Sequence, residues 1–201
     1  IVGTAYADGG AGKSNTVFGK TAGDSLAADG NYNAFFGENA GTANTTGDYN
    51  VAIGADALPD NTSGLGSIAI GRTALYSSTT SSYNVAIGTN SLYANTGGTR
   101  NIAMGYRSQR RTTSGSDNTA IGYDVMFANT TGSNNTALGS YVLDANIGGS
   151  DNTAVGNNVL TANTSGGSNT AIGKHALYAN ITGDDNVAVG KSAGAVITTE
   201  S

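Results

Sequence analysis

Residues 118–122 read Asn-Thr-Ala-Ile-Gly, and variants of this phrase return along almost the whole chain of 201 residues. The closing glycines recur at a constant interval, as from Gly122 to Gly139, and only the first interval, from Gly19 to Gly37, is longer by one position. These strand glycines are Gly19, Gly37, Gly54, Gly71, Gly88, Gly105, Gly122, Gly139, Gly156, Gly173 and Gly190. A fixed period predicts a solenoid in which each repeat stacks on the last. The chain is therefore expected to be mainly β: a β-roll or β-helix of about eleven 17-residue coils.

The phrase itself predicts a short strand, because its side chains alternate between two faces. The residue before the strand glycine is always large and apolar, as in Ile53 and Leu138, and the residue three before it is usually Thr, Val or Ile. Ala and Asn occupy the alternate positions. We expect the bulky columns to form the interior. The thin Ala face should approach another layer, either the far wall of the same chain or a neighbouring chain, and we expect it, together with the aromatic face, to meet neighbouring chains.

A second apolar segment follows each strand glycine, for example residues 74–76, Ala-Leu-Tyr, and residues 125–127, Val-Met-Phe. Adjacent apolar residues do not alternate, and Ala, Leu and Tyr tolerate a helical turn. Val142, Gly23 and Gly194 fit a helix interior poorly. A second short strand and a single helical turn both remain open here, and either would close the coil.

Glycine ends the strand at a corner that needs a positive φ or leaves no room for a Cβ. A second glycine corner follows ten residues later, preceded by an Asn three positions before it. This Asn recurs as Asn44, Asn61, Asn95, Asn129, Asn146, Asn163 and Asn180. Stacked in successive coils, such amides can bond one another and the turn backbone.

Composition limits the classes of function. The formal net charge of −5 disfavours a nucleic-acid partner, whose phosphates need a basic footprint. No stretch approaches the length of an apolar membrane span, so no membrane insertion is expected. Without cysteine there is no disulfide framework and no thiolate metal site. Like residues at many places, rather than unlike residues converging at one, also point away from an enzyme, and neither catalytic residues nor cofactors are expected.

The repeat at residues 118–134 resembles the shafts of phage tail-fibre and bacterial surface-fibre proteins, and the resemblance covers nearly all of residues 15–201. Its Asn-x-Ala-x-Gly core is also similar to the head repeats of trimeric autotransporter adhesins, which are usually shorter. The resemblance implies an extracellular, cell-surface or virion fibre with structural and adhesive roles. It further implies self-association, as a homotrimer or a head-to-tail filament.

We expect one repeat domain over residues 1–201, with an irregular or partial first coil at 1–14 and regular coils over 15–201. Residues 1–3, Ile-Val-Gly, resemble the end of another strand phrase, and residues 191–201 make most of a further coil. Neither end shows a polar cap. A fragment of a longer array and a subunit that stacks end to end both fit this pattern.

One basic cluster interrupts the repeat, since four of the nine Lys and Arg residues lie within twelve positions. These are Arg100, Arg107, Arg110 and Arg111. They are candidates for contact with a glycan or a host receptor. The alternative, favoured for an isolated charge cluster, is that they pair with acids of neighbouring coils such as Asp117.

Other residues are weaker candidates. The single histidine, His175, cannot form a triad or metal cluster and is expected to be exposed. The acids Asp48, Asp117, Asp151, Asp184 and Asp185 lack the glycine-rich calcium phrase and are interpreted as turn residues. Tyr76, Tyr93, Phe127 and Tyr178 form a partial aromatic column, which suits packing between chains. Thr columns allow a minor alternative, an ice-binding solenoid.

The sequence thus predicts a structural subunit of an extracellular fibre or filament, assembled by lateral or end-to-end packing of coils. An adhesin or receptor-binding tail-fibre shaft is the alternative.

Overall fold

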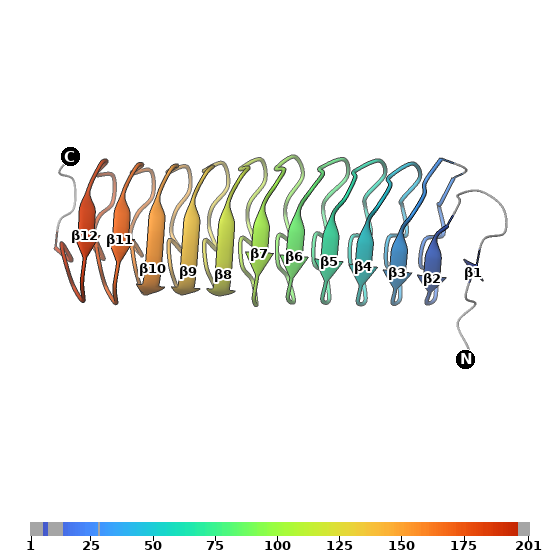
Figure 1. Cartoon of the computed structure of the whole chain (residues 1–201), viewed down its shortest axis with the longest axis horizontal. Coiled ribbons are helices and arrows are strands. Elements are labelled where there is room, and N and C mark those ends of the chain that lie inside the picture. Colours follow the sequence, from blue (N-terminus) through green and yellow to red (C-terminus); the bar gives the residue numbers. More distant parts are fainter. Residues whose placement is uncertain (1–5, 8–13, 28, 197–201) are drawn as a thin grey trace.

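The chain forms a straight solenoid whose coils stack along one axis (Figure 1). The computed structural model describes residues 6–7, 14–27 and 29–196. Eleven parallel strands, β2 to β12, pair in chain order, and no described residue is helical. The expected β-solenoid is confirmed. At about 4.8 Å per strand, eleven strands extend the sheet about 50 Å.

Each coil contributes one strand to a single sheet. The strands are β1 Tyr6–Ala7, β2 Thr16–Phe18, β3 Ala34–Phe36, β4 Val51–Ile53, β5 Ile68–Ile70, β6 Val85–Ile87, β7 Ile102–Met104, β8 Thr119–Tyr123, β9 Thr136–Ser140, β10 Thr153–Asn157, β11 Thr170–Ile172 and β12 Val187–Val189. Like pairs with like, so that Ala120 lies opposite Ala137 and Ala154 opposite Ala171. The strand β1 pairs antiparallel with β2, while residues 1–3 and 197–201 of the expected end coils lie outside the described residues.

The two faces of the strands are the reverse of our expectation. Ala at the strand centre is fully buried, as in Ala52 and Ala137, whereas the flanking Ile53 and Leu138 are 40% and 46% exposed. The Ala column is buried inside the coil against the far wall of the same chain, so the prediction that the Ala face meets neighbouring chains is wrong. The prediction that the bulky columns form the interior was wrong for a physical reason: a coil this short encloses too little volume for two large side chains per strand. The large apolar side chains of the strand must therefore point outward.

The interior is filled from the second segment, where Leu follows the strand glycine by four residues. Leu58, Leu75, Leu92, Leu143 and Leu160 are all fully buried. In one coil the large and the small interior residues are interchanged. Phe35 stands at the strand position where other coils carry Ala, and Gly41 stands where they usually carry Leu. A Cβ on Gly41 would lie 2.6 Å from the Phe35 ring. Volume is conserved within the coil, as a close-packed interior requires.

The second segment is a run of turns and forms neither a second strand nor a helix in the described residues. Its backbone alternates into the left-handed region: Asp124 has φ 49° and Met126 has φ 51° within one coil. The turn closes with i to i−3 hydrogen bonds such as Asn129 N to Met126 O, 3.2 Å. Repeated left-handed residues prevent continuation into a right-handed helix.

The strand glycines occupy a conformation that other residues rarely adopt. Gly139 has φ 139°, and a Cβ there would collide with the carbonyl oxygen of Gly156 in the next coil. Coils can stack at strand spacing only because this corner lacks a side chain.

Two buried columns of Asn follow the axis of the solenoid, one interrupted by Ser67 and the other by Ser78 and Thr112. The sequence predicted hydrogen bonding for the column at the second corner, which contains Asn146. In one, the Asn118 side chain donates to Asn101 Oδ1 at 3.0 Å and to Gly132 O at 2.9 Å. In the other, Asn146 Nδ2 donates to Asn129 Oδ1 at 2.9 Å. Most of these amides donate to the coil before them and to the corner of their own coil, whereas others, such as Asn33, Asn50 and Asn129, donate to the corner carbonyl alone. Buried polar groups are thereby satisfied along the axis.

A polar layer interrupts the apolar core at its middle. It consists of Ser108, Gln109 and Thr112, all fully buried, at positions where other coils carry Ala or Val, Leu and Asn. The core consequently divides into one cluster that extends to Ala103 and another that begins at Ala120. The Gln109 Oε1 and Thr112 Oγ1 atoms in this layer have no hydrogen-bond partner.

Candidate functional site

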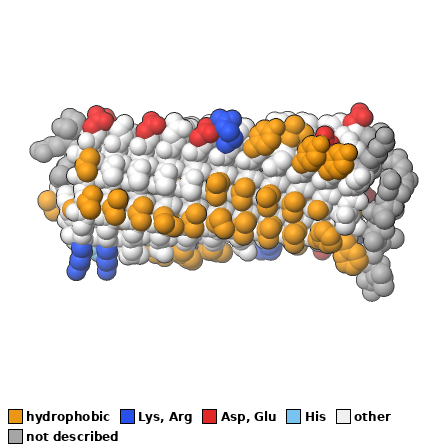
Figure 2. Space-filling model, viewed as in Figure 1, with side chains coloured by type: hydrophobic (Ala, Val, Ile, Leu, Met, Phe, Trp, Pro, Cys, Tyr) orange, Lys and Arg blue, Asp and Glu red, His pale blue; other side chains and the backbone are white. Residues whose placement is uncertain are grey.

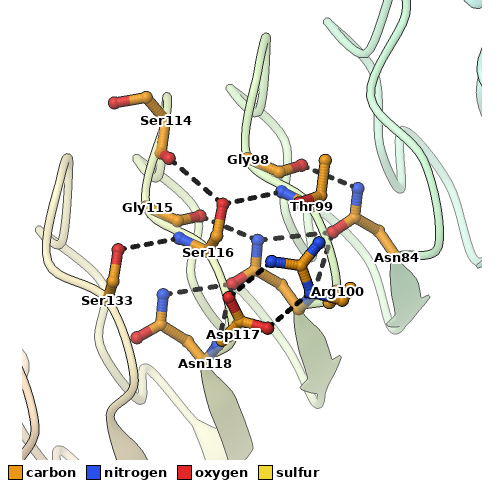
Figure 3. Close-up of polar contacts among 11 residues, drawn as sticks. Asn84, Gly98, Thr99, Arg100, Ser114, Gly115, Ser116, Asp117, Asn118 and Ser133 are labelled. Carbon is orange, nitrogen blue, oxygen red and sulfur yellow. Dashed lines mark hydrogen bonds and ion pairs between the residues drawn. The ribbon is translucent and has the colours of Figure 1, made fainter.

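The four candidate arginines do not form one patch. Arg100 lies five residues before a strand glycine, at a corner, and its guanidinium forms two hydrogen bonds with Asp117 of the next coil, at 2.6 and 2.8 Å (Figure 3). This hydrogen bonding lowers the pKa of Asp117 below its ordinary value. Exposed pairs of this kind add little stability. Arg100 therefore has the neighbouring-coil partner that the structural alternative proposed.

At the same corner, a second series of hydrogen bonds joins the backbone of one coil to a side chain of the next coil (Figure 3). Ser116 Oγ accepts a hydrogen bond from Thr99 N at 3.0 Å, and Ser133 Oγ accepts one from Ser116 N at 3.1 Å. Asp48 and Asp184 do the same for the backbone of Asn31 and Gly167, both at 2.6 Å. These two acids act as turn residues.

The other three arginines gather around one aromatic ring, and we call Arg107, Arg110 and Arg111 the arginine cluster. Their Cζ atoms lie 4.7, 5.9 and 5.1 Å from the centroid of Phe127, respectively. Such distances are within the range of cation–π attraction. Phe127 lies one repeat beyond Arg110, so the period of the sequence places these two side by side; the approach of Arg107 and Arg111 to the same ring does not follow from the period.

Only one member of the arginine cluster is neutralised. Arg107 forms two hydrogen bonds with the carboxylate of Asp124, at 2.7 and 2.8 Å, and these raise the pKa of Arg107. Within the described part of the chain, Arg110 and Arg111 form no ion pair. Arg110 also has a buried Nε with no hydrogen-bond partner. An unsatisfied buried donor costs about 1–3 kcal/mol.

Arg110 is built into the aromatic column that the sequence indicated. The Tyr76 and Tyr93 rings stack at 5.0 Å, and Arg110 Cζ lies 5.2 Å from the Tyr93 centroid, between Tyr93 and Phe127. Tyr178 is three coils further on and contacts His175 instead, with ring centroids 5.3 Å apart. His175 is partly buried rather than fully exposed.

Asp144 follows Phe127 in the same column, one coil along. Burial raises the pKa of Asp144, and the charge of Asp124 raises it further. Hydrogen bonds from the backbone of Asp144 and Ala145 offset part of this rise. Asp144 Oδ1 has no hydrogen-bond partner, and Asp144 forms no ion pair with Arg110 in the described residues.

The second candidate surface is the outer face of the sheet, which the sequence had assigned to the interior. It consists of the two outward side chains of each strand from β2 to β12, none of which is charged. Figure 2 shows apolar side chains in a continuous row along the rod, doubled over part of its length. The doubled part corresponds to β4–β7, where both positions are apolar: Val51, Ile53, Ile68, Ile70, Val85, Ile87, Ile102 and Met104. Over β8–β11 one column is Thr.

Two other types of site were sought in the described residues. No group of three or more His, Asp or Glu side chains there could hold a metal ion. None of the described segments is a helix long and apolar enough to cross a membrane.

The chain was compared with protein-family models, with curated proteins and with solved structures, and nothing matches in any of the three.

Proposed function

We propose that this protein is a structural subunit of an extracellular fibre or filament, in which copies of the chain pack side by side through the outer face. The observation that carries the proposal is the uncharged face of β2–β12, in particular its apolar part over β4–β7. Contiguous exposed apolar surface of this extent marks interaction sites on proteins. The extracellular location rests on the resemblance to phage and bacterial fibre shafts.

A second copy of this chain is the partner whose geometry fits best. Side chains on the outer face recur once per coil, at about 4.8 Å. Only a surface with the same spacing stays in register with them over many coils, and another copy has that spacing by construction. The shaft would lengthen by stacking coil on coil in the same register.

The outer face extends over the whole sheet. It offers outward side chains from all eleven parallel strands, an extended surface of the kind from which stable interfaces of roughly 800 Å² per partner are built. The apolar part over β4–β7 would form the centre of the contact, and the Thr columns its more polar continuation.

Electron microscopy and sedimentation velocity over a concentration series test this function. We expect fibres wider than one solenoid, whose amount rises with concentration. The variant Ile53→Lys/Ile102→Lys should prevent lateral association, because each change buries a charge in the contact. The matched control is Ile147→Lys/Ile181→Lys. These isoleucines are as exposed, at 52% and 42% against 40% and 39%, but lie at the second corner, outside the outer face.

Monodisperse single chains at high concentration would contradict the proposal, and so would equal assembly by both Lys variants. A milder variant guards against misfolding: Val51→Thr/Ile102→Thr places on β4 and β7 the residue that β8–β11 carry at the position in register. It should weaken assembly while leaving the thermal midpoint close to that of the wild type.

An adhesin or receptor-binding shaft is the second candidate. The observation that favours it is the arginine cluster, in which two of three charges have no carboxylate partner among the described residues.

A further inference from the structure

Arg110 and Arg111 are adjacent cations that form no ion pair, on a chain whose formal net charge is −5. Both lie close to the Phe127 centroid, at 5.9 and 5.1 Å. Arg72, Lys174 and Lys191 also form no ion pair in the described residues, but none of these three is stacked on an aromatic ring there. The ion pairs in the described residues use Lys20, Arg100 and Arg107. Two neighbouring cations repel each other, so an anion bound between them would relieve that repulsion.

The two side chains differ in how they are held. Arg110 lies between the Tyr93 and Phe127 rings, and its Nε is buried. Its terminal nitrogens are therefore the groups that can reach a ligand. Arg111 is exposed, and its backbone N donates to Phe127 O at 3.2 Å, which fixes the chain beneath it. Stacking on the rings fixes the orientation of the guanidinium before a ligand binds. Its parallel N–H groups then suit an anion, such as a carboxylate or a sulfate, that accepts two hydrogen bonds.

Neutral hydrogen-bonding groups continue from the cations along the same column. Tyr93 and Tyr76 follow Arg110 towards the N-terminus at one-coil spacing, and both are partly exposed. Their rings stack face to face, so the phenol edges and hydroxyls remain for contact with a ligand. A cation pair beside a row of hydroxyls is suited to a sugar that carries one acidic group among several hydroxyl groups.

We infer that Arg110 and Arg111 bind the anionic group of an acidic polysaccharide, with Tyr76 and Tyr93 contacting neighbouring sugar hydroxyls. The anionic group is a uronic acid carboxylate or a sulfate ester, both of which accept hydrogen bonds from arginine forks. Nucleic acid is disfavoured, because a cluster with two unpaired cations on an acidic chain cannot neutralise the several phosphates that such binding requires.

Binding to immobilised polygalacturonate, dextran sulfate and uncharged dextran tests the inference, with dispersed protein at physiological salt. We expect the wild type to bind at least one of the two acidic polymers and not dextran, and the polymer bound identifies the anionic group. Arg110→Gln/Arg111→Gln should weaken binding at least tenfold. The matched control Arg72→Gln/Lys174→Gln removes the same charge from other coils and should bind within twofold of the wild type.

Two further variants separate a built site from general attraction. Arg110→Lys keeps the charge but not the fork, and Phe127→Leu keeps an apolar residue in the column but removes the ring under three guanidinium groups. Each should weaken binding at least threefold with an unchanged thermal midpoint. The inference is overturned if the wild type binds neither acidic polymer, or if the Arg72→Gln/Lys174→Gln control loses as much affinity as the double arginine variant.

Discussion

A methyl group is too large for the position that Gly139 occupies. The residue has φ 139°, and its Cβ would meet the Gly156 carbonyl of the next coil. We expect Gly139→Ala to lower the free energy of unfolding by about 3 kcal/mol or more, from backbone strain and steric overlap together. Urea denaturation measures the change.

The same coil supplies the control. Gly148 is outside the positive φ region, and a Cβ there would meet only Thr131 Oγ1, at 3.4 Å. Gly148→Ala should change the free energy of unfolding by less than about 1 kcal/mol, in the stabilising direction, because it restricts the unfolded chain. If the two variants were equally stable, the close stacking of strand glycines would not limit the fold.

These residues also show what a sequence can predict. The glycine corners, the strand and the Asn columns follow from chemistry that each residue type carries with it. The orientation of the strand does not, because alternation distinguishes two faces without saying which is inside. Which face lies inside depends on how much space the closed coil encloses. This space holds the side chain of Ala52, while that of Ile53 points outward and is 40% exposed.

The turn segment and the arginine cluster were less predictable for a related reason. Leu58 and Met126 adopt left-handed backbone conformations that neither residue favours alone, and the stacked coils impose them. The contact of Phe127 with three arginines depends on the lateral alignment of adjacent coils. The repeat period places residues at equivalent positions of successive coils side by side, but it does not say which residues at different positions of the repeat come into contact.

The Asn columns act as continuous elements, and Asn135 is a typical member. Its side chain donates to Asn118 Oδ1 at 3.1 Å and to Gly149 O at 2.9 Å, and its Oδ1 accepts two hydrogen bonds from Asn152, both at 3.0 Å. Asn135→Ala should lower the free energy of unfolding by about 3 kcal/mol, because it leaves buried donors of Asn152 without an acceptor.

The chain contains its own partial replacement for this residue. Ser67 occupies the equivalent position in another coil, and its Oγ accepts a hydrogen bond from Asn84 N at 3.3 Å. Asn135→Ser should therefore be less destabilising than Asn135→Ala by about 1 kcal/mol. Equal losses in thermal and urea denaturation would show that the columns contribute packing and not hydrogen bonds.

The whole rod should open first at its polar layer. A solenoid is held together by contacts between neighbouring coils, so its stability varies along the axis. At Gln109 the apolar core is interrupted, and Oε1 is buried without a partner. In hydrogen exchange with mass spectrometry, we expect backbone amides of residues 105–115 to exchange sooner than those of residues 137–160.

Gln109→Leu restores the residue type that Leu92 provides one coil away. It should slow exchange at residues 105–115 and raise the free energy of unfolding by about 1 kcal/mol, since an apolar side chain replaces an amide whose buried Oε1 has no partner. The gain is reduced because the change also removes the hydrogen bond from Gln109 Nε2 to Ile102 O, 3.1 Å. Uniform exchange along the wild-type rod would contradict this account.

The matched register of neighbouring strands has a consequence for how such a chain can change over generations. Because Ala120 pairs with Ala137 and Ala154 with Ala171 in the same way, removing or duplicating any segment one repeat long joins two coils that already fit. Unequal recombination could thus alter the length of the rod without selecting a new fold. The coil that contains Phe35 and Gly41 is an exception. A recombination point between these two residues would separate the large Phe35 side chain from the glycine that leaves room for it.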